Sequence, residues 1–420
     1  MFQFFSKGNS NAVLLSVALA IFLGIYFPSL FEPIRFVGDL FIHLLKLFAL
    51  PLICSALIAA LGNLAGNLSL LKSIAKKVVG YMLLSEVMAV AIALILFNLL
   101  HPGSQGNASL FAGNELAHTT DHSKFGLANF VLSIFPENIF YSLTHFELLP
   151  VVIFSILFGL GCTFVGDLSK PFVQLATSVR DISSKCLHGV MLFAPLGIFV
   201  LVGSGVAQSH ISGSLEANFM ALLGFVAVLF LGLFLHAFWQ LVLAAFVSKQ
   251  KMTDILRSNL SVFSTAFGTS SSLATLPVAM HAADQLKADS FATRFMLPLC
   301  ASINVGGMMM YEMAAVLFFS QMLGIDLSLS QQILLAIACI LGGMAEGGIP
   351  ETSMVSLVMV FKIVNIPLSA ISVLLPLDRI IDRVRTVVNI FGNVCGVIFV
   401  SQLMKKTKTE VQMKETPSVT

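Results

Sequence analysis

The feature that most constrains the fold of this chain is a series of apolar stretches about as long as a membrane-spanning helix. Examples are Ala12 to Phe27, Val78 to Leu100 and Ala217 to Val247, and a helix needs about 20 apolar residues to cross a bilayer. Because only 10% of the 420 residues are charged, the chain cannot cover a water-facing surface with polar side chains. Long runs of this kind lack the short alternating segments of a membrane barrel. The sequence therefore predicts an all-α polytopic membrane protein.

Six conventional spans are predicted in the first part of the chain, and the pattern changes after Ser258. From there on, Gly, Ser, Thr, Asn and Pro repeatedly interrupt the apolar sequence. Broken helices at membrane depth are tolerated where they are buried in protein or line a wet cavity, as in the binding sites of transporters. We therefore expect the functional residues in the C-terminal half. The six spans are roughly Asn11–Leu30, Phe36–Leu64, Val78–Leu100, Phe125–Phe164, Leu187–Val206 and Ala217–Val247.

Two segments of the C-terminal half share a plan that predicts re-entrant helical hairpins. Asp254–Ala282 and Gln332–Ile363 each have two short apolar arms around a Ser/Gly-rich tip, and the tips end in Pro277 and Pro350. Counting of Lys and Arg starts the first hairpin on the cytoplasmic side and the second outside, as expected of an inverted repeat. The alternative is a pair of ordinary spans kinked by proline.

The placement of the positive charges predicts the orientation of the chain. Lys and Arg gather after the second, fourth and sixth spans, whereas the loops between these positions contain almost none. Cytoplasmic loops carry the excess of positive charge, so both termini are expected in the cytoplasm. The charged tail after Lys405 is expected to be disordered. The six cysteines stand singly without metal-binding spacing, which predicts buried thiols and no disulfide.

The last apolar segment contains a stripe of polar side chains. Its members are four, three, four and four positions apart, so they share one face of a helix. Ionisable groups inside a span are costly and indicate function, and Asp382 with Arg385 is suited to bind the ammonium and carboxylate groups of a zwitterion. The alternative is an internal ion pair between these two residues. The stripe consists of Asp378, Asp382, Arg385, Asn389 and Asn393.

Other polar groups in apolar sequence are weaker candidates. The run Ser270-Ser271-Ser272 offers hydroxyl and amide groups to a carboxylate if a half-helix begins there, although serine runs also serve helix packing. Burial raises the proton affinity of a carboxyl group, so each acidic residue in an apolar setting is a candidate proton carrier or has a structural role. These acidic residues are Glu86, Glu312 and Glu346.

Five motifs in chain order resemble those of one transporter family. LLKLFALPL and APLGIFVLV resemble its second and fifth helices, and TAFGTSSSLATLP resembles its serine-rich first hairpin. GGIPETS is similar to the second hairpin, and DRIIDRVRTVVNIFGN is similar to the substrate-binding last helix. The family is the dicarboxylate/amino acid:cation symporters, which includes the glutamate transporters. The resemblance covers nearly the whole chain.

The resemblance implies eight transmembrane helices plus two re-entrant hairpins with inverted repeats. It also implies a homotrimer in the plasma or inner membrane, in which a moving transport domain slides against a fixed scaffold. The implied division is 1–76 for scaffold helices one and two, 77–101 for helix three of the transport domain, 125–207 for scaffold helices four and five, 216–404 for the rest of the transport domain, and 405–420 for a cytoplasmic tail.

The resemblance further implies uptake of an acidic amino acid, glutamate or aspartate, together with cations by alternating access. Asp382 would bind the substrate's ammonium group and Arg385 its side-chain carboxylate, while Asn389 and Ser272 would bind the α-carboxylate. The tip of the second hairpin would close over the substrate. The complete implied substrate-binding set is Ser271, Ser272, Gly348, Ile349, Asp382, Arg385, Thr386 and Asn389.

The sequence departs from the family pattern at the cation sites. The family's NMDGT motif reads NVGGM here, so Gly306 replaces a sodium-binding aspartate, and Asn393 replaces another. Sodium sites favour at least one carboxylate, so the sequence favours proton coupling through Glu86 or through Glu312, which aligns with the family's proton-carrying position. Residual sodium would use carbonyl groups of the second hairpin with Asn304, Asn389 and Asn393. The coupling candidates are Ser85, Glu86, Ser302, Asn304, Glu312 and Asn393.

Three alternatives compete with this function. A sodium-coupled symporter of a C4-dicarboxylate or another amino acid stays open, because Met308 replaces a threonine expected near the substrate. A substrate-gated anion channel would suit the same architecture. An intramembrane serine hydrolase is disfavoured, since no GxSxG elbow is present. No enzyme activity, nucleic-acid partner or cofactor other than a transported cation is expected.

Overall fold

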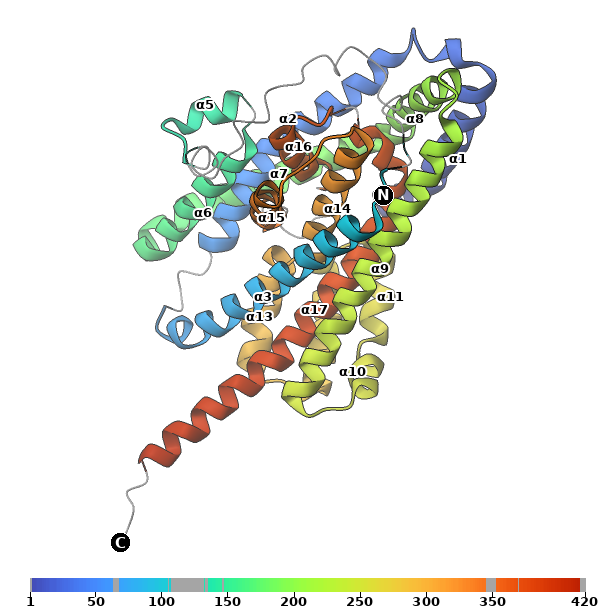
Figure 1. The fold of residues 1–420 in the computed structure, drawn as a ribbon. Helices are drawn as coiled ribbons and strands as arrows, with labels where there is room; N and C mark the ends of the chain where they lie inside the picture. The colour runs from blue at the N-terminus through green and yellow to red at the C-terminus, as the bar shows by residue number, and fades with distance from the viewer. Residues whose placement is uncertain are drawn as a thin grey trace.

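The computed structural model describes residues 2–62, 68–104, 106, 132, 135–145, 147–344, 353–368 and 370–415, and these residues fold as helices joined by turns (Figure 1). Within them, six helical stretches are long and apolar enough to cross a membrane. The prediction of an all-helical chain with membrane-compatible helices is confirmed. The six stretches are Lys76–Leu100, Leu149–Leu187, Ala194–Ile211, Leu215–Ser248, Ala292–Met322 and Leu377–Lys405.

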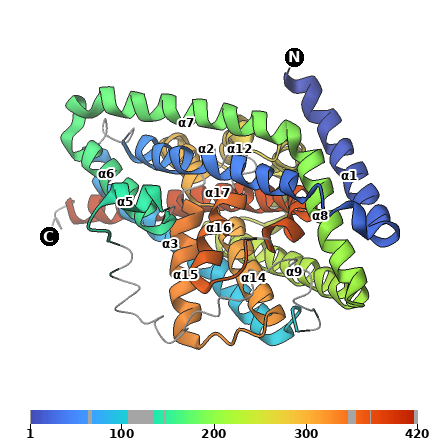
Figure 2. The ribbon, with the colours of Figure 1, turned by 90° about the horizontal axis from the view of Figure 1, so that it is seen from above.

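One group of helices comes from the N-terminal half. Helix α1 packs along α8, and α2 packs against α6, α7 and α8, so that this group forms one side of the molecule in Figure 2. Glycines allow the close approach, since a Cβ on Gly24 would lie 3.0 Å from the carbonyl oxygen of Gly203, as in other membrane helix pairs. The members are α1 (Phe2–Tyr26), α2 (Arg35–Gly62), α6 (Leu148–Val165), α7 (Lys170–Val190) and α8 (Ala194–Ile211).

A second group of helices surrounds α14. Sixteen residues of α14 are buried, from Gly306 through Ser320 and again at Met322, and a helix that is apolar and buried on all sides belongs in the centre of a bundle. It contacts α3, α9, α15, α16 and α17. The long helices of this group are α3 (Leu68–Leu100), α9 (Leu215–Ser248), α14 (Gly306–Met322) and α17 (Ala370–Glu415).

Short and broken helices complete the second group. Helices α11 and α12 meet at Ser270 and Ser271, where Ser270 has a left-handed backbone with φ of 51°, and both helices pack against α17. Helices α13 and α14 are separated by Asn304 and Val305. Helices α15 and α16 contact each other. Their bounds are α10 (Met252–Ser258), α11 (Leu260–Thr269), α12 (Ser272–Gln285), α13 (Ser290–Ile303), α15 (Leu329–Met344) and α16 (Ser353–Val364).

Two predicted spans have different boundaries in the structure. The expected span Phe125–Phe164 is wrong as a single helix, because α5 (Ile139–Thr144) is separate from α6. The Asn138 side chain accepts a hydrogen bond from the backbone N–H of Phe140 and so caps α5, which fixes a new helix start. The span expected at Leu187–Val206 is divided by a short 3₁₀ turn between α7 and α8.

Two further expectations are corrected. Pro277 lies inside α12, so the first tip is shorter than expected and consists of Ser270 and Ser271. The tail beyond Lys405 is not structureless, because α17 continues to Glu415 and projects from the body of the molecule (Figure 1). The residues after Lys405 include several good helix formers, and no Gly or Pro occurs before Pro417, so nothing in the sequence ends the helix earlier.

Candidate functional site

The polar stripe on α17 forms a buried ionic cluster. Nη2 of Arg385 lies 3.0 Å from Oδ1 of Asp378 and 3.1 Å from Oδ1 of Asp382. Arg385 is only 1% exposed, and the spacing of seven and three residues brings both carboxylates to its face of the helix. Removal of an ion from water costs several kcal/mol unless it is paired, so the two carboxylates compensate the burial of the guanidinium.

Helix α14 provides the other wall of this cluster. The guanidinium carbon of Arg385 lies 4.3 Å from the ring centroid of Tyr311, a cation–π contact that strengthens when water is excluded. Nη1 of Arg385 also contacts the sulfur of Met308. Sequence reasoning placed Asp378 on the stripe without giving it a role and did not identify Tyr311. The seven-residue spacing of Asp378 from Arg385 was the available signal.

Asn389 connects the stripe to the first turn of α14. Its Oδ1 accepts a hydrogen bond of 2.7 Å from the backbone N–H of Gly307, one of the N–H groups that have no partner within a helix at its N-terminus. A Cβ on Gly307 would lie 2.9 Å from the same oxygen, so glycine permits this approach. Thr386 donates its hydroxyl to the backbone oxygen of Asp382 at 2.8 Å. Asp382, Arg385, Thr386 and Asn389 therefore lie close together on α17.

The serine tip joins α11 and α12, and both of these helices pack against α17, the helix that carries the Arg385 cluster. Ser271 caps α12 by accepting a hydrogen bond from Ala274 N–H at 3.2 Å, and Ser272 is buried in the first turn of α12. Among the described residues, no hydrogen bond joins either hydroxyl to the polar groups of α17. The predicted tip residues Gly348 and Ile349, together with Glu346, lie outside the described residues.

The predicted coupling residues fall into separate places. Nδ2 of Asn304 donates to Oδ1 of Asn393 at 2.7 Å, and both amides are buried between the α13–α14 break and α17. Ser85 lies on α3 and accepts a hydrogen bond from Gln240 of α9. Ser302 bonds only within its own helix, to the carbonyl oxygen of Pro298. The Asn304–Asn393 pair and Ser85 lie near each other, because Gln240, the partner of Ser85, is in contact with Gly392. Within the described chain, no hydrogen bond joins Ser302 to these residues.

The two buried acidic candidates face different neighbours. Glu312 is fully buried and follows Tyr311, and its carboxylate lies beside α15, where a Cβ on Gly342 would be 3.4 Å from Oε2. Glu86 is also fully buried, next to Ser85 on α3. Within the described residues, no cluster of three or more His, Cys, Asp or Glu side chains could hold a metal ion.

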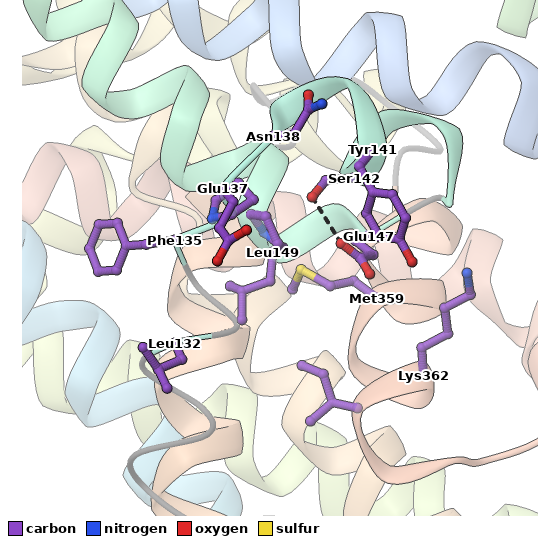
Figure 3. A pocket seen from close by; sticks show the side chains of 13 residues that line it. Leu132, Phe135, Glu137, Asn138, Tyr141, Ser142, Glu147, Leu149, Met359 and Lys362 are labelled. Carbon is purple, nitrogen blue, oxygen red and sulfur yellow. Dashed lines mark hydrogen bonds between the residues drawn. The ribbon is translucent and has the colours of Figure 1, made fainter.

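A cavity of about 660 Å³ lies elsewhere, between α5, α6 and α16 (Figure 3). Ser142 donates to a carboxylate oxygen of Glu147 at 2.8 Å on one wall, and Lys362 lies on the other. No residue of α17 lines this cavity. It is therefore separate from the Arg385 cluster.

Comparison with known proteins places nearly the whole sequence in one transporter family. The family model described as "Sodium:dicarboxylate symporter family" matches residues 10–403. A proton/glutamate-aspartate symporter of Escherichia coli (strain K12) is 30% identical over 372 residues, which cover 87% of this chain and 84% of that protein. A proton/sodium-glutamate symport protein of Bacillus caldotenax is 27% identical over 403 residues, covering 94% of each chain.

A third relative extends the range of substrates. A C4-dicarboxylate transport protein of Rhodospirillum rubrum is 29% identical over 394 residues, covering 93% of this chain and 87% of that protein. The family match and the relatives thus span nearly the whole chain, and they are transporters rather than enzymes. The resemblance inferred from the motifs is confirmed, and the chain belongs to the sodium:dicarboxylate symporter family.

Proposed function

We propose that this protein is a secondary active symporter that takes up glutamate or aspartate together with protons. The observation that carries the proposal is the Arg385 guanidinium, buried on α17 within 3.1 Å of Asp382. A guanidinium binds a carboxylate through two parallel hydrogen bonds, and a carboxylate binds an ammonium group. The two side chains together match the charges of an acidic amino acid. The E. coli relative, a proton/glutamate-aspartate symporter, supports this substrate class.

Substrate binding requires Arg385 to exchange partners. Its Nη2 is held by Asp378 and Asp382, so the side-chain carboxylate of the substrate replaces at least one of these contacts. Asp382 then accepts hydrogen bonds from the substrate ammonium group, and Asn389 and Ser272 bind the α-carboxylate. Ser271 and Thr386 support these contacts, and the tip containing Gly348 and Ile349 closes over the substrate.

The charge balance of the cluster explains why cations accompany the substrate. Asp378, Asp382 and Arg385 sum to a formal charge of −1 when all three are ionised, and an acidic amino acid adds another −1. In a medium of low polarity, two uncompensated negative charges are costly. Uptake of protons removes that cost, so the coupling follows from electrostatics.

Protons are the favoured coupling ions because the chain lacks carboxylates at two sodium positions of the family. Gly306 and Asn393 stand at those positions, and Asn393 is already bonded to Asn304. Glu312 is buried one residue from Tyr311, the residue that stacks on Arg385. We assign Glu312 as the main proton carrier, with Glu86 as a second candidate.

The two helix groups support a division into scaffold and transport domain. Segments 1–76 and 125–207 form the scaffold of a trimer, and 77–101 with 216–404 form the moving domain. The proposed topology has eight spans, two hairpins and both termini in the cytoplasm. Extensive contacts within each group of helices favour the proposal, because alternating access needs two bodies that stay rigid while they move.

Uptake of radiolabelled aspartate and glutamate into proteoliposomes tests the function. A proton gradient and a sodium gradient are imposed separately, with liposomes lacking the protein as the control. We expect accumulation with the proton gradient alone. Accumulation that requires sodium contradicts proton coupling, and the absence of uptake under both gradients contradicts the substrate class. Flux that only equilibrates the substrate indicates a substrate-gated channel instead.

A C4-dicarboxylate is the second candidate substrate. Met308 contacts Arg385 where the family has a threonine, and the Rhodospirillum rubrum relative is a C4-dicarboxylate transport protein. Asp382 favours an amino acid, because a dicarboxylate has no ammonium group to bind it. Competition by succinate against labelled aspartate distinguishes the two candidates.

A further inference from the structure

A second set of buried polar side chains joins α9 to α3. His236 and Gln240 stand one turn apart on α9 and are 1% and 2% exposed. Nε2 of Gln240 lies 2.9 Å from Nε2 of His236 and 3.2 Å from Oγ of Ser85. The ring of Trp239 stacks on the imidazole at a centroid distance of 5.9 Å. A chain of three polar side chains therefore crosses an otherwise apolar helix interface.

Two glycines make room for this chain of side chains. A Cβ on Gly306 would lie 3.0 Å from Nε2 of His236, so the imidazole occupies the space that a side chain at position 306 would need. The Gln240 amide lies so close to Gly392 that any Cβ there would clash with it. Gly306 follows Asn304 by two residues, and Gly392 precedes Asn393. The chain of His236, Gln240 and Ser85 therefore borders the Asn304–Asn393 pair, and we call these five side chains the coupling network.

Several buried atoms of the coupling network have no hydrogen-bond partner within the described part of the chain. They are Nδ1 of His236, Oε1 of Gln240, Oδ1 of Asn304 and Nδ2 of Asn393. An unsatisfied buried polar group costs about 1–3 kcal/mol, and most buried polar side chains in proteins are satisfied. A cluster of such atoms is therefore better explained by ion binding than by packing.

The hydrogen bonds indicate how His236 changes its protonation. Nε2 of Gln240 can only donate, so with the amide oriented as in the structure, Nε2 of His236 accepts and the ring is neutral with its proton on Nδ1. A proton that binds Nε2 converts this atom into a donor. Gln240 must then rotate to present Oε1, the atom that has no partner.

We propose that His236 is a proton-binding coupling residue of the transport cycle, with Gln240 turning to accept from the imidazolium. This inference rests on the proposed symport and adds a proton site separate from Glu312. The imidazolium would supply, from the chain itself, a positive charge beside Gly306.

The surroundings of His236 contain few groups that compete for this proton. On α3, the Tyr81 hydroxyl donates to the carbonyl oxygen of Gly392 at 2.7 Å. Glu312 on α14 lies beside Gly342, and Arg385 on α17 is held by its two aspartates. The ionisable groups on the elements packed against α9 include Lys76, Lys77, Tyr81 and Glu86 on α3, Tyr311 and Glu312 on α14, Asp378, Arg379, Asp382, Arg383, Arg385, Cys395 and Lys405 on α17, His210 on α8, and Asp254 and Arg257 on α10.

The first test observes the ring directly and does not depend on transport. The full-length protein with ¹⁵N-labelled histidine is placed in lipid nanodiscs and followed by NMR from about pH 3 to 8, a range that includes and extends below the usual titration range of histidine. The His236 signals are assigned by their absence from His236→Gln. We expect the neutral ring to become an imidazolium in this range, with or without aspartate. A ring that stays neutral under every condition overturns the proposal.

The second test counts the protons carried with each substrate, from the reversal potential of uptake in proteoliposomes. We expect His236→Gln, and His236→Asn as a second variant, to carry one proton fewer per substrate. The matched control is His281→Gln, because His281 bonds to Gln285 at 3.1 Å with the same four-residue spacing but is exposed on α12. Equal proton counts in the wild type and both His236 variants overturn the coupling role. If the wild type accumulates substrate only with sodium, the proton coupling of the proposed function fails, and the NMR titration alone decides whether His236 binds a proton.

Discussion

Two buried polar regions on α17 satisfy their hydrogen bonds in different ways. The first half of the helix carries Asp378, Asp382 and Arg385, whose charges are paired with each other. The second half carries Gly392 and Asn393, which lie against neutral amides and a phenol. The first region contains ionised side chains that are paired with each other. The second contains neutral polar side chains, and some of their atoms have no hydrogen-bond partner within the described residues. A transporter needs this difference, because substrate recognition requires fixed charge and coupling requires a charge that comes and goes.

The largest effect is expected from Arg385→Ala, which breaks the charge balance of the first region. Two carboxylates would remain buried without their cation, and loss of one partner from a buried ion pair costs about 3–5 kcal/mol. Uptake of aspartate should fall by roughly 100-fold or more, with a lower thermal stability. Arg385→Gln combined with Asp378→Asn serves as the control, because it restores the charge balance without the guanidinium. Aspartate uptake in either variant at the wild-type rate would contradict the site.

The second prediction concerns Glu312, the proposed main proton carrier. Glutamine keeps the shape of the side chain but cannot exchange a proton, so Glu312→Gln should lower proton-driven accumulation by about tenfold or more. The measurement is the ratio of accumulation under a proton gradient to exchange of labelled against unlabelled aspartate. A ratio equal to that of the wild type would contradict this role for Glu312 and would leave the network around His236 as the proposed proton site. The control is Glu216→Gln, because Glu216 lies in the first turn of α9 and is not one of the proposed coupling residues.

The third prediction separates the two carboxylates of the cluster. Asp382→Asn removes the proposed partner of the substrate ammonium group, and a hydrogen bond to a charged group contributes about 1.5–3 kcal/mol. The KM for aspartate should rise by roughly tenfold, while inhibition by succinate, which has no ammonium group, should weaken less. Asp378→Asn should affect both ligands equally, since neither ligand contacts Asp378 in the proposed complex. Equal changes for both ligands in Asp382→Asn would contradict the amino-acid assignment.

The sequence predicted the Asp382–Arg385 ion pair, which was the alternative to a ligand-binding role, because its signal is local. Asp382 and Arg385 stand three residues apart on one helix, so their contact follows from helix geometry alone. The all-helical class and the two short arms around Ser270 followed from apolar length and from the interruptions by small residues. Local patterns therefore sufficed wherever one helix determined the outcome.

The coupling network could not be predicted, because its members are distant in the sequence. Gln240 contacts Ser85 across 155 positions, and the fit of His236 over Gly306 depends on how α9 packs against α14. The break between α5 and α6 was missed for a related reason. Both flanking segments are apolar, and a capping side chain such as Asn138 decides the boundary.

The smallest effect is expected at the serine tip, and it decides how far the charged region extends. Ser271→Ala removes the cap of α12, which contributes about 1 kcal/mol to stability, and should lower the melting temperature with little change in the KM for aspartate. Ser272→Ala should do the opposite, because Ser272 is buried and has no capping role, so that its proposed contact is with the α-carboxylate. The matched pair compares thermal unfolding with the concentration dependence of uptake. If both variants change only stability, the serine tip belongs to the packing of α12 on α17, and the substrate site is confined to α17 and the second hairpin.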